Sequence, residues 1–270
     1  MNLIDVWLLD LAGLAASFLF LVYASWRDIA TREVTNRLWV VSYPAGFVLL
    51  GARLLAQPEL WQLIVISIAV TSVVSLGLSF LGLWGGADAK GFICLAINNP
   101  IAPVIGGAVF PSMDPFFPLI VFSNSFLASL ASLIYPVQRN LRSARLNNLF
   151  VGFEGESSFD RIAAFFIGYR VTFDELRSSH FLFPIEYTDS QGPDPRRRFR
   201  FELRVDRDPL KELAEIKGTA GPGRSNDKVW VSPGLPFIVF IAAGLALSIM
   251  FGDIIWCGVS AVMRSLASTI

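Results

Sequence analysis

Two aspartates in this sequence stand beside long apolar stretches, where an ionised side chain is costly. Asp28 follows the first such stretch in the run SWRDIATREVTN, and Asp88 follows the third in LWGGADAKGF. Charged residues at such places in membrane chains are rare and commonly functional. Two carboxylates a few ångströms apart share a proton, because both cannot easily ionise. Such a pair can activate water with one carboxylate and protonate a carbonyl oxygen with the other, as in aspartic proteases.

Each aspartate also has a simpler interpretation. Asp88 stands where a helix is expected to begin, and an acid there stabilises the helix by roughly 0.3–1 kcal/mol. Asp28 stands where a helix is expected to end, and it could pair with Arg27 or Arg32 at the membrane surface. A shared site becomes the better interpretation if both aspartates lie on one side of the membrane, with Glu33 as a nearby rival.

Composition indicates an integral membrane protein. The 270-residue chain is 54% hydrophobic and 16% charged, whereas about a quarter of the residues in soluble domains are charged. A formal net charge of +0 gives no sign of a nucleic-acid surface. The single histidine and two distant cysteines do not suggest a metal cluster or a triad. We therefore expect the lipid bilayer as a partner, and no nucleic acid, metal or cofactor.

Six stretches have the length of about 20 apolar residues that crosses a bilayer. They are residues 6–25, 38–55, 60–83, 89–110, 116–135 and 235–251. The fourth is interrupted by Asn98, Asn99 and Pro100, and irregular backbone at that depth must be buried in protein or reach water. Tryptophans near span ends are typical of an aromatic belt. Here these are Trp7, Trp26, Trp39, Trp84 and Trp256.

The basic residues predict the orientation of these spans. They gather after the first, third and fifth spans, which places those connections in the cytoplasm and the N-terminus outside. Asp28 and Asp88 then share the cytoplasmic side. Asp10 belongs to the outer side, because a helix separates it from Asp28 by roughly 27 Å. Orientation alone thus allows the two aspartates to form one site.

A polar region between the fifth and last spans has a different character. Helical patterns near residues 159–168 and 209–217 flank strand patterns near 181–187 and 198–205, with the turn signal TDSQGPDP between the strands. Its first stretch, QRNLRSARLNNLF, is basic and amphipathic and could lie along the inner membrane face.

The expected fold is therefore α-helical and membrane-embedded, with six transmembrane helices and an α+β cytoplasmic domain inserted before the last helix. The membrane domain covers residues 1–135 and carries both aspartates. The cytoplasmic domain covers 136–233, and the last helix with the C-terminal tail covers 234–270. The tail from residue 254 either extends the last helix or lies on the interface.

SWRDIATREVTN followed by GGADAK resembles the archaeal preflagellin and type IV prepilin peptidases, which are polytopic aspartyl proteases of the GxGD class. Val229 to Asp253 also resembles the way the final span begins in the archaellum-processing members. Ala87 stands where the strict GxGD string has glycine, and archaeal members share this looser pattern. The cysteine-rich loop and the methylating module of the longer bacterial enzymes are missing from this sequence. The resemblance therefore implies cleavage without N-methylation.

The resemblance implies that Asp28 and Asp88 are the catalytic pair. Gly85 and Gly86 form the glycine context of the second aspartate and are expected to let backbones approach closely. Ala87 and Lys90 are the neighbours expected to support the site or bind substrate.

The implied substrate is the short, basic-then-apolar signal peptide of a preflagellin or prepilin, cut at the cytoplasmic face without a cofactor. Acids of the inserted domain such as Asp174 and Glu175 are expected to help recognise its basic head. Two other functions stay open from the residues alone. One is a proton-coupled transporter with the aspartates as relay groups, and the other is a non-catalytic membrane scaffold.

Overall fold

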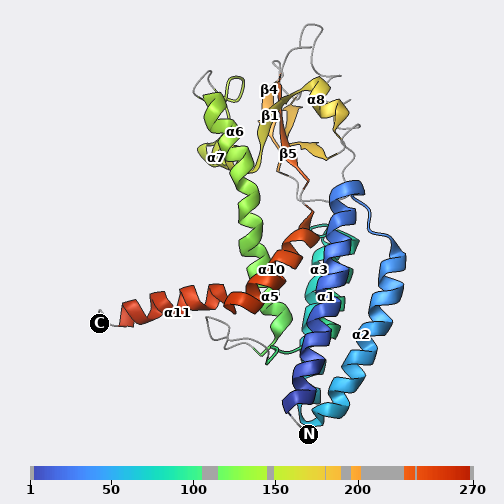
Figure 1. Ribbon diagram of the computed structural model, residues 1–270. Helices are drawn as coiled ribbons and strands as arrows, with labels where there is room; N and C mark the ends of the chain where they lie inside the picture. Colours follow the sequence, from blue (N-terminus) through green and yellow to red (C-terminus); the bar gives the residue numbers. More distant parts are fainter. Residues whose placement is uncertain are drawn as a thin grey trace. The chain divides into compact units, whose positions relative to one another are not determined.

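The computed structural model describes residues 3–104, 115–144, 149–179, 181–189, 196–201, 228–234 and 236–267. The chain divides into two compact units (Figure 1). Met1–Ser129 and Pro236–Ile270 form the first, called the membrane unit here, and Leu130–Leu235 form the second, called the insert unit.

Helices make up the described part of the membrane unit. They are α1 (Leu3–Thr31), α2 (Asn36–Ala56), α3 (Trp61–Phe80), α4 (Gly86–Asn98), α5 (Phe117–Ser129), α10 (Phe237–Phe251) and α11 (Ile254–Ala267). A 3-10 turn at Pro58–Leu60 precedes α3.

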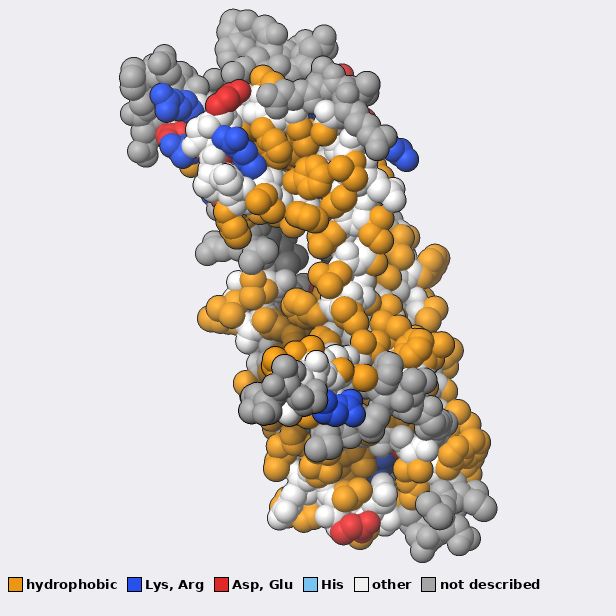
Figure 2. Space-filling view, turned by 90° about the vertical axis from the view of Figure 1, so that its left-hand side faces the viewer, with side chains coloured by type: hydrophobic (Ala, Val, Ile, Leu, Met, Phe, Trp, Pro, Cys, Tyr) orange, Lys and Arg blue, Asp and Glu red, His pale blue; other side chains and the backbone are white. Residues whose placement is uncertain are grey.

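Large apolar side chains on α1 to α3 are exposed, including Leu19 (74%), Val40 (72%) and Phe80 (93%). Figure 2 shows how widely apolar side chains cover one face of the molecule. An outward apolar face is what helices surrounded by lipid require, and it makes this a membrane protein.

Among the described residues, four stretches are long and apolar enough to cross a bilayer. They are Val6–Thr31, Asn36–Ala56, Pro58–Phe80 and Phe117–Ala144. The expected fourth span shares only residues 89–98 with α4, and the expected last span corresponds to α10; both helices are shorter than these four. Residues 105–114, which include the end of the expected fourth span, lie outside the described residues. The tail does not extend the last helix, because α10 ends at Phe251, the following Gly252 has a positive φ of 79°, and α11 follows as a separate helix.

The interruption expected at Asn98, Asn99 and Pro100 is confirmed, and it is buried in protein. The Nδ2 groups of Asn98 and Asn99 donate to the Ser17 hydroxyl of α1 at 3.2 and 2.7 Å, and Asn99 also donates to the Gly13 carbonyl at 3.2 Å. A Cβ atom at Gly13 would lie 2.6 Å from the Asn98 carbonyl oxygen, so glycine is required at this approach. Ser and Gly are the residues that let membrane helices pack closely and bond across their contact.

The buried half of α4 forms the centre of the membrane unit. It packs against α1, α2, α3 and α10. Phe92 and Leu95 are fully buried, together with Leu21 of α1 and Ile241 of α10. The position of α4 is therefore fixed by five neighbouring helices, because α5 contacts it as well.

In its described residues, the insert unit combines three helices with two small sheets. The helices are α6 (Ile134–Ala144), α7 (Ser158–Ile167) and α8 (Phe173–Ser178), and a 3-10 turn at Leu130–Leu133 precedes α6. One antiparallel sheet has the order β1 (Tyr169–Thr172), β5 (Lys228–Pro233), β2 (Leu182–Pro184), with Val171 opposite Val229. The other pairs β3 (Glu186–Asp189) with β4 (Arg196–Phe199), with Glu186 opposite Phe199.

The sequence-based elements of this unit are partly confirmed. The helix expected near 159–168 is α7. The strand expected at 181–187 is two strands, because the chain changes partner at Ile185. Its N–H still donates to the Trp230 carbonyl of β5 at 3.0 Å, whereas its carbonyl accepts the Arg200 N–H, just after β4, at 2.8 Å. The second expected strand begins earlier, at Arg196, and beyond residue 201 it lies outside the described residues, as do the helix expected at 209–217 and most of the turn between the strands. The central strand β5 was not expected.

The arginine-rich run of β4 is paired within the insert unit. Arg197 forms a bidentate contact with the buried Glu186 at 2.6 and 2.7 Å, and Glu186 also accepts the Trp230 N–H at 2.9 Å. Arg198 lies 3.5 Å from both Glu156 and Asp189. These arginines therefore serve packing within the unit.

Candidate active site

Asp28 lies in the last turn of α1, where the chain leaves the helix. Its side chain is half-buried. Its backbone carbonyl accepts the N–H of Arg32 at 3.0 Å, and Arg32 adopts the left-handed conformation with φ of 55°. Glycine is the common residue in this conformation after a helix, since other residues are strained there. The chain thus turns sharply at Arg32, which keeps this residue beside the end of α1.

Asp88 lies in the first turn of α4, outside the four candidate spans. Its Oδ2 atom accepts the backbone N–H of Gly85 at 3.1 Å, and it receives a second backbone hydrogen bond from Ile238 in the first turn of α10. Two helix N-termini therefore face one carboxylate, and both favour its ionised form.

The structure brings Asp28 and Asp88 close enough to interact electrostatically. Burial first, and then the neighbouring Asp28 carboxylate, raise the pKa of Asp88 to about 7, against the opposing effect of its backbone hydrogen bonds and of Arg32. Arg32 interacts electrostatically with both aspartates. Helix α1 is held to α10 beside this pair, where the Ser25 hydroxyl donates to the Ile238 carbonyl at 3.4 Å. The arrangement is two acids and one cation at the ends of α1 and α4.

Lys90 holds α4 to α2. Its Nζ donates to Asn36 Oδ1 at 2.8 Å, and the Tyr43 hydroxyl donates to its backbone carbonyl at 3.0 Å. Asn36 lies in the same SWRDIATREVTN run as Asp28, so one short stretch supplies an aspartate and a contact to the helix of the other. The sequence analysis did not select Asn36 or Tyr43 as site residues. Asn36 could have been selected, because it is a polar residue at the end of the SWRDIATREVTN run that contains Asp28.

The glycines before Asp88 differ in their surroundings. A Cβ atom at Gly85 would lie 3.1 Å from Asp88 Oδ2, whereas one at Gly86 would meet nothing within 4 Å. The close approach of another backbone, expected at both glycines, is found at neither, because the neighbour of Gly85 is the Asp88 side chain. Ala87 packs against the apolar core of the membrane unit.

Trp84 anchors the segment before α4. It is buried, and its ring lies 5.6 Å from Phe92, 5.6 Å from Phe122 and 5.0 Å from Phe237, measured between ring centroids.

Glu33, the rival acid, is exposed in the connection between α1 and α2. The half-buried acids on this side are thus Asp28 and Asp88.

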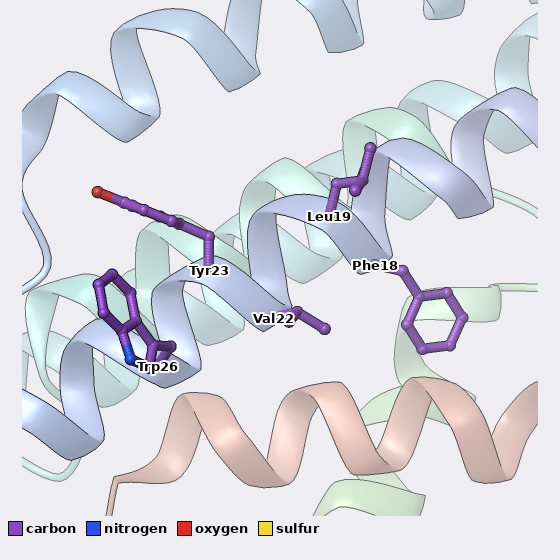
Figure 3. Close-up of a pocket in the computed structure, with 5 residues that line it drawn as sticks. All are labelled: Phe18, Leu19, Val22, Tyr23 and Trp26. Carbon is purple, nitrogen blue, oxygen red and sulfur yellow. The ribbon is translucent and has the colours of Figure 1, made fainter.

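An apolar hollow lies on α1 a turn before Asp28. Its lining side chains project from successive turns of the helix (Figure 3). They are Phe18, Leu19, Val22, Tyr23 and Trp26. None of them carries a carboxylate, so the hollow itself is an apolar surface.

Two family models match most of the chain. The type IV leader peptidase family matches residues 15–137, which contain both aspartates, and the archaeal peptidase A24 C-terminus of type II matches residues 160–254. The chain belongs to the archaeal preflagellin and prepilin peptidase family. This membership confirms the resemblance carried by SWRDIATREVTN and GGADAK.

Among curated members of this family, prepilin peptidase EppA of Methanothermobacter thermautotrophicus is 31% identical over 134 residues. The alignment covers 47% of this chain and 35% of the relative. The chain thus spans about a third of the length of the curated relative that it matches.

Proposed function

We propose that this chain is a membrane aspartyl endopeptidase that removes the signal peptide of preflagellins and prepilin-like precursors. Family membership supports a peptidase, and the electrostatic coupling of Asp28 with Asp88 supports a two-aspartate mechanism. That coupling carries the proposal, because a carboxyl group with a pKa of about 7 beside a second carboxyl group can hold the single proton that such a mechanism needs.

In the proposed reaction, the ionised carboxylate takes a proton from water while the water oxygen bonds to the scissile carbonyl carbon. The protonated carboxyl group gives its proton to the carbonyl oxygen, and a neutral tetrahedral diol forms. When the diol collapses, the C–N bond breaks, the amine nitrogen gains a proton from one carboxyl group, and a diol hydroxyl returns its proton to the other. The pair ends with one proton, as it began.

The proposed substrate follows from the family and from the relative's activity on prepilins. A precursor with a basic head and an apolar segment can leave the segment in the bilayer while its scissile bond reaches the aspartates. Exposed Asp174 is suited to meet such a head, whereas Glu175 is engaged by the Thr172 N–H at 2.9 Å and by Arg139 at 3.5 Å. Cleavage without N-methylation remains part of the proposal.

The proposed topology has six membrane-embedded segments, of which the fourth begins after Asp88 within α4 and the sixth is α10. The N-terminus lies outside, and the aspartates and the insert unit lie in the cytoplasm. The distribution of basic residues supports this orientation.

Processing of a co-expressed preflagellin in isolated membranes tests the proposal. We expect Asp28→Asn and Asp88→Asn each to abolish cleavage while inserting normally. The matched control is Glu33→Gln, which neutralises the exposed acid nearest to Asp28 in the sequence and should cleave like the unaltered chain. Normal cleavage by either aspartate variant would remove that residue from the mechanism, and cleavage of no precursor by the unaltered chain would argue against the substrate.

A further inference from the structure

Helix α7 of the insert unit carries an apolar face that the protein leaves open. Phe159, Ile162 and Phe166 are 77%, 57% and 45% exposed. Their spacing puts them on one side of the helix. Another side of the same helix packs inward, where Ala164 is fully buried. Three large apolar side chains on one exposed helical face indicate a partner, since soluble surfaces rarely gather them.

Helix α7 is fixed against α6, the C-terminal part of the candidate span Phe117–Ala144. The buried Asn140 of α6 donates from Nδ2 to the carbonyls of Phe165 and Gly168, at 2.7 and 2.6 Å. These bonds satisfy two carbonyls that the end of α7 would otherwise leave open. The last turn of α7 therefore lies directly beside Asn140.

The residues between α7 and the apolar part of this span are of the kind found at a membrane surface. The Tyr169 ring, just after α7, lies 5.3 Å from the Tyr135 ring between centroids. The Arg139 guanidinium lies 4.6 Å above the Tyr169 ring. Tyrosine and arginine concentrate where a bilayer meets water.

The spacing along α6 gives the depth of the contact. Ile134 and Tyr135 are 57% and 55% exposed at the end of the apolar stretch. Asn140 follows Tyr135 by about 7.5 Å along the helix. The headgroup region on each side of a bilayer is about 5–8 Å thick, so Asn140 and the end of α7 fall within it.

We infer that α7 is an interfacial membrane helix, with Phe159, Ile162 and Phe166 inserted at the boundary between lipid headgroups and acyl chains. A lipid surface fits this face for a second reason: the insert unit joins the membrane unit at both of its ends, after Ser129 and before Pro236, so bilayer is always within reach. A helix that exposes aromatic and aliphatic side chains on one face can bury that face at the boundary between headgroups and acyl chains. The insert unit then contacts the membrane through α7 as well as through its two connections.

Nitroxide labels on the full-length protein in lipid nanodiscs test this inference. Single cysteines are introduced at Phe159, Ile162 and Phe166 in a Cys257→Ser background, because the other cysteine, Cys94, is fully buried. Collisions are measured with oxygen, which concentrates in lipid, and with a water-soluble nickel chelate. Val40→Cys on the exposed face of α2 is the lipid control, and Asp174→Cys on the exposed surface of α8 is the water control.

We expect the labels at all three α7 positions to behave like the label of the lipid control Val40→Cys, with frequent oxygen collisions and protection from the nickel chelate. If the α7 labels instead behave like the label of the water control Asp174→Cys, with frequent nickel collisions, this face points to water and the inference is overturned. Labels shielded from both reagents would show that protein covers the face, either another part of this chain or a second copy, and would overturn it equally. Because the three side chains are exposed, their replacement leaves the packing of α7 intact.

Discussion

Asp10 of α1 and Arg53 of α2 form a buried ion pair at the end of α1 away from Asp28. The second carboxylate oxygen of Asp10 accepts the N–H of Val104 at 2.8 Å, in the segment that follows α4. One carboxylate thus ties together α1, α2 and the chain beyond the buried interruption of α4. Since α4 also carries Asp88, this pair contributes to the position of the candidate site from the opposite end.

Replacing Arg53 with methionine should destabilise the membrane unit strongly, because it leaves the buried Asp10 carboxyl group without its cationic partner. The loss expected is roughly 3–5 kcal/mol, as for other broken buried pairs. The double variant Asp10→Asn with Arg53→Met should lose less, since asparagine can still accept the Val104 N–H. Thermal unfolding in detergent micelles measures both. A double variant less stable than Arg53→Met alone would contradict this account.

Processing should fall as the pH rises above about 7. The pKa of Asp88 is raised from 3.8 to about 7, so the folded state holds this proton more tightly than the unfolded chain does. The stability that the proton contributes is complete below pH 3.8 and is lost as the pH rises through 7. The shared proton is lost over the same range. Initial rates of processing across roughly pH 5 to 9 should show this alkaline limb.

Neutralising Asp28 should lower the pKa of Asp88, because the Asp28 carboxylate is the second cause of its elevation after burial. Infrared titration of the protonated carboxyl band in Asp28→Asn provides the measurement, since the variant is expected to be inactive. Glu33→Gln serves as the control and should leave the band unchanged. An unaltered titration in Asp28→Asn would mean that the two acids do not interact.

Arg32→Gln should shift the alkaline limb to higher pH. The Arg32 charge lowers the pKa of Asp88, so its removal makes the shared proton harder to lose. Arg32→Lys keeps the charge and should keep the profile closer to that of the unaltered chain, while Arg37→Gln removes an exposed charge of α2 as the control. A limb that stays in place in Arg32→Gln would show that this cation does not act on the pair.

Much of the membrane unit could be predicted from hydropathy, but its packing could not. The interruption at Asn98 and Asn99 was visible because polar residues and proline break an apolar run. Trp39 and Trp84 were assigned to an aromatic belt, yet they are 5% and 6% exposed within the core. Position near a span end does not tell whether a side chain faces lipid or a neighbouring helix.

A different reason explains why strand β5 was not predicted from the sequence. Lys228–Pro233 adjoins the apolar run of α10, so its valines and tryptophan were counted with the approach to the last span. Its partners β1 and β2 come much earlier in the chain, and pairing of this kind leaves no local pattern. At the candidate site, charge and orientation singled out both aspartates, whereas Asn36 and Tyr43 are defined only by where α2 packs on α4.

The contact between Lys90 and Asn36 should support catalysis through position. Lys90→Met and Asn36→Ala should each slow processing by about fivefold, the rate equivalent of about 1 kcal/mol for one hydrogen bond. The double variant should be no slower than either single one, because all three lose the same contact. Initial rates with a preflagellin substrate measure this. Additive losses would indicate that the two side chains act separately.

Gly85 and Gly86 offer a matched pair of substitutions one residue apart. Alanine at Gly85 would place its Cβ 3.1 Å from Asp88 Oδ2, which forces the carboxylate to move by a few tenths of an ångström. It also replaces a favoured helix N-cap residue with a poor one. Alanine at Gly86 meets nothing within 4 Å and suits the first turn of a helix better than glycine.

We therefore expect Gly85→Ala to lower the processing rate by about tenfold, equivalent to about 1.4 kcal/mol in the barrier, and Gly86→Ala to retain it with equal or slightly greater thermal stability. Initial rates and unfolding temperatures are measured on both variants in the same membranes. If Gly86→Ala loses activity as Gly85→Ala does, the requirement concerns the flexibility of the whole glycine segment. If both are active, the contact between Gly85 and the Asp88 carboxylate does not limit the reaction.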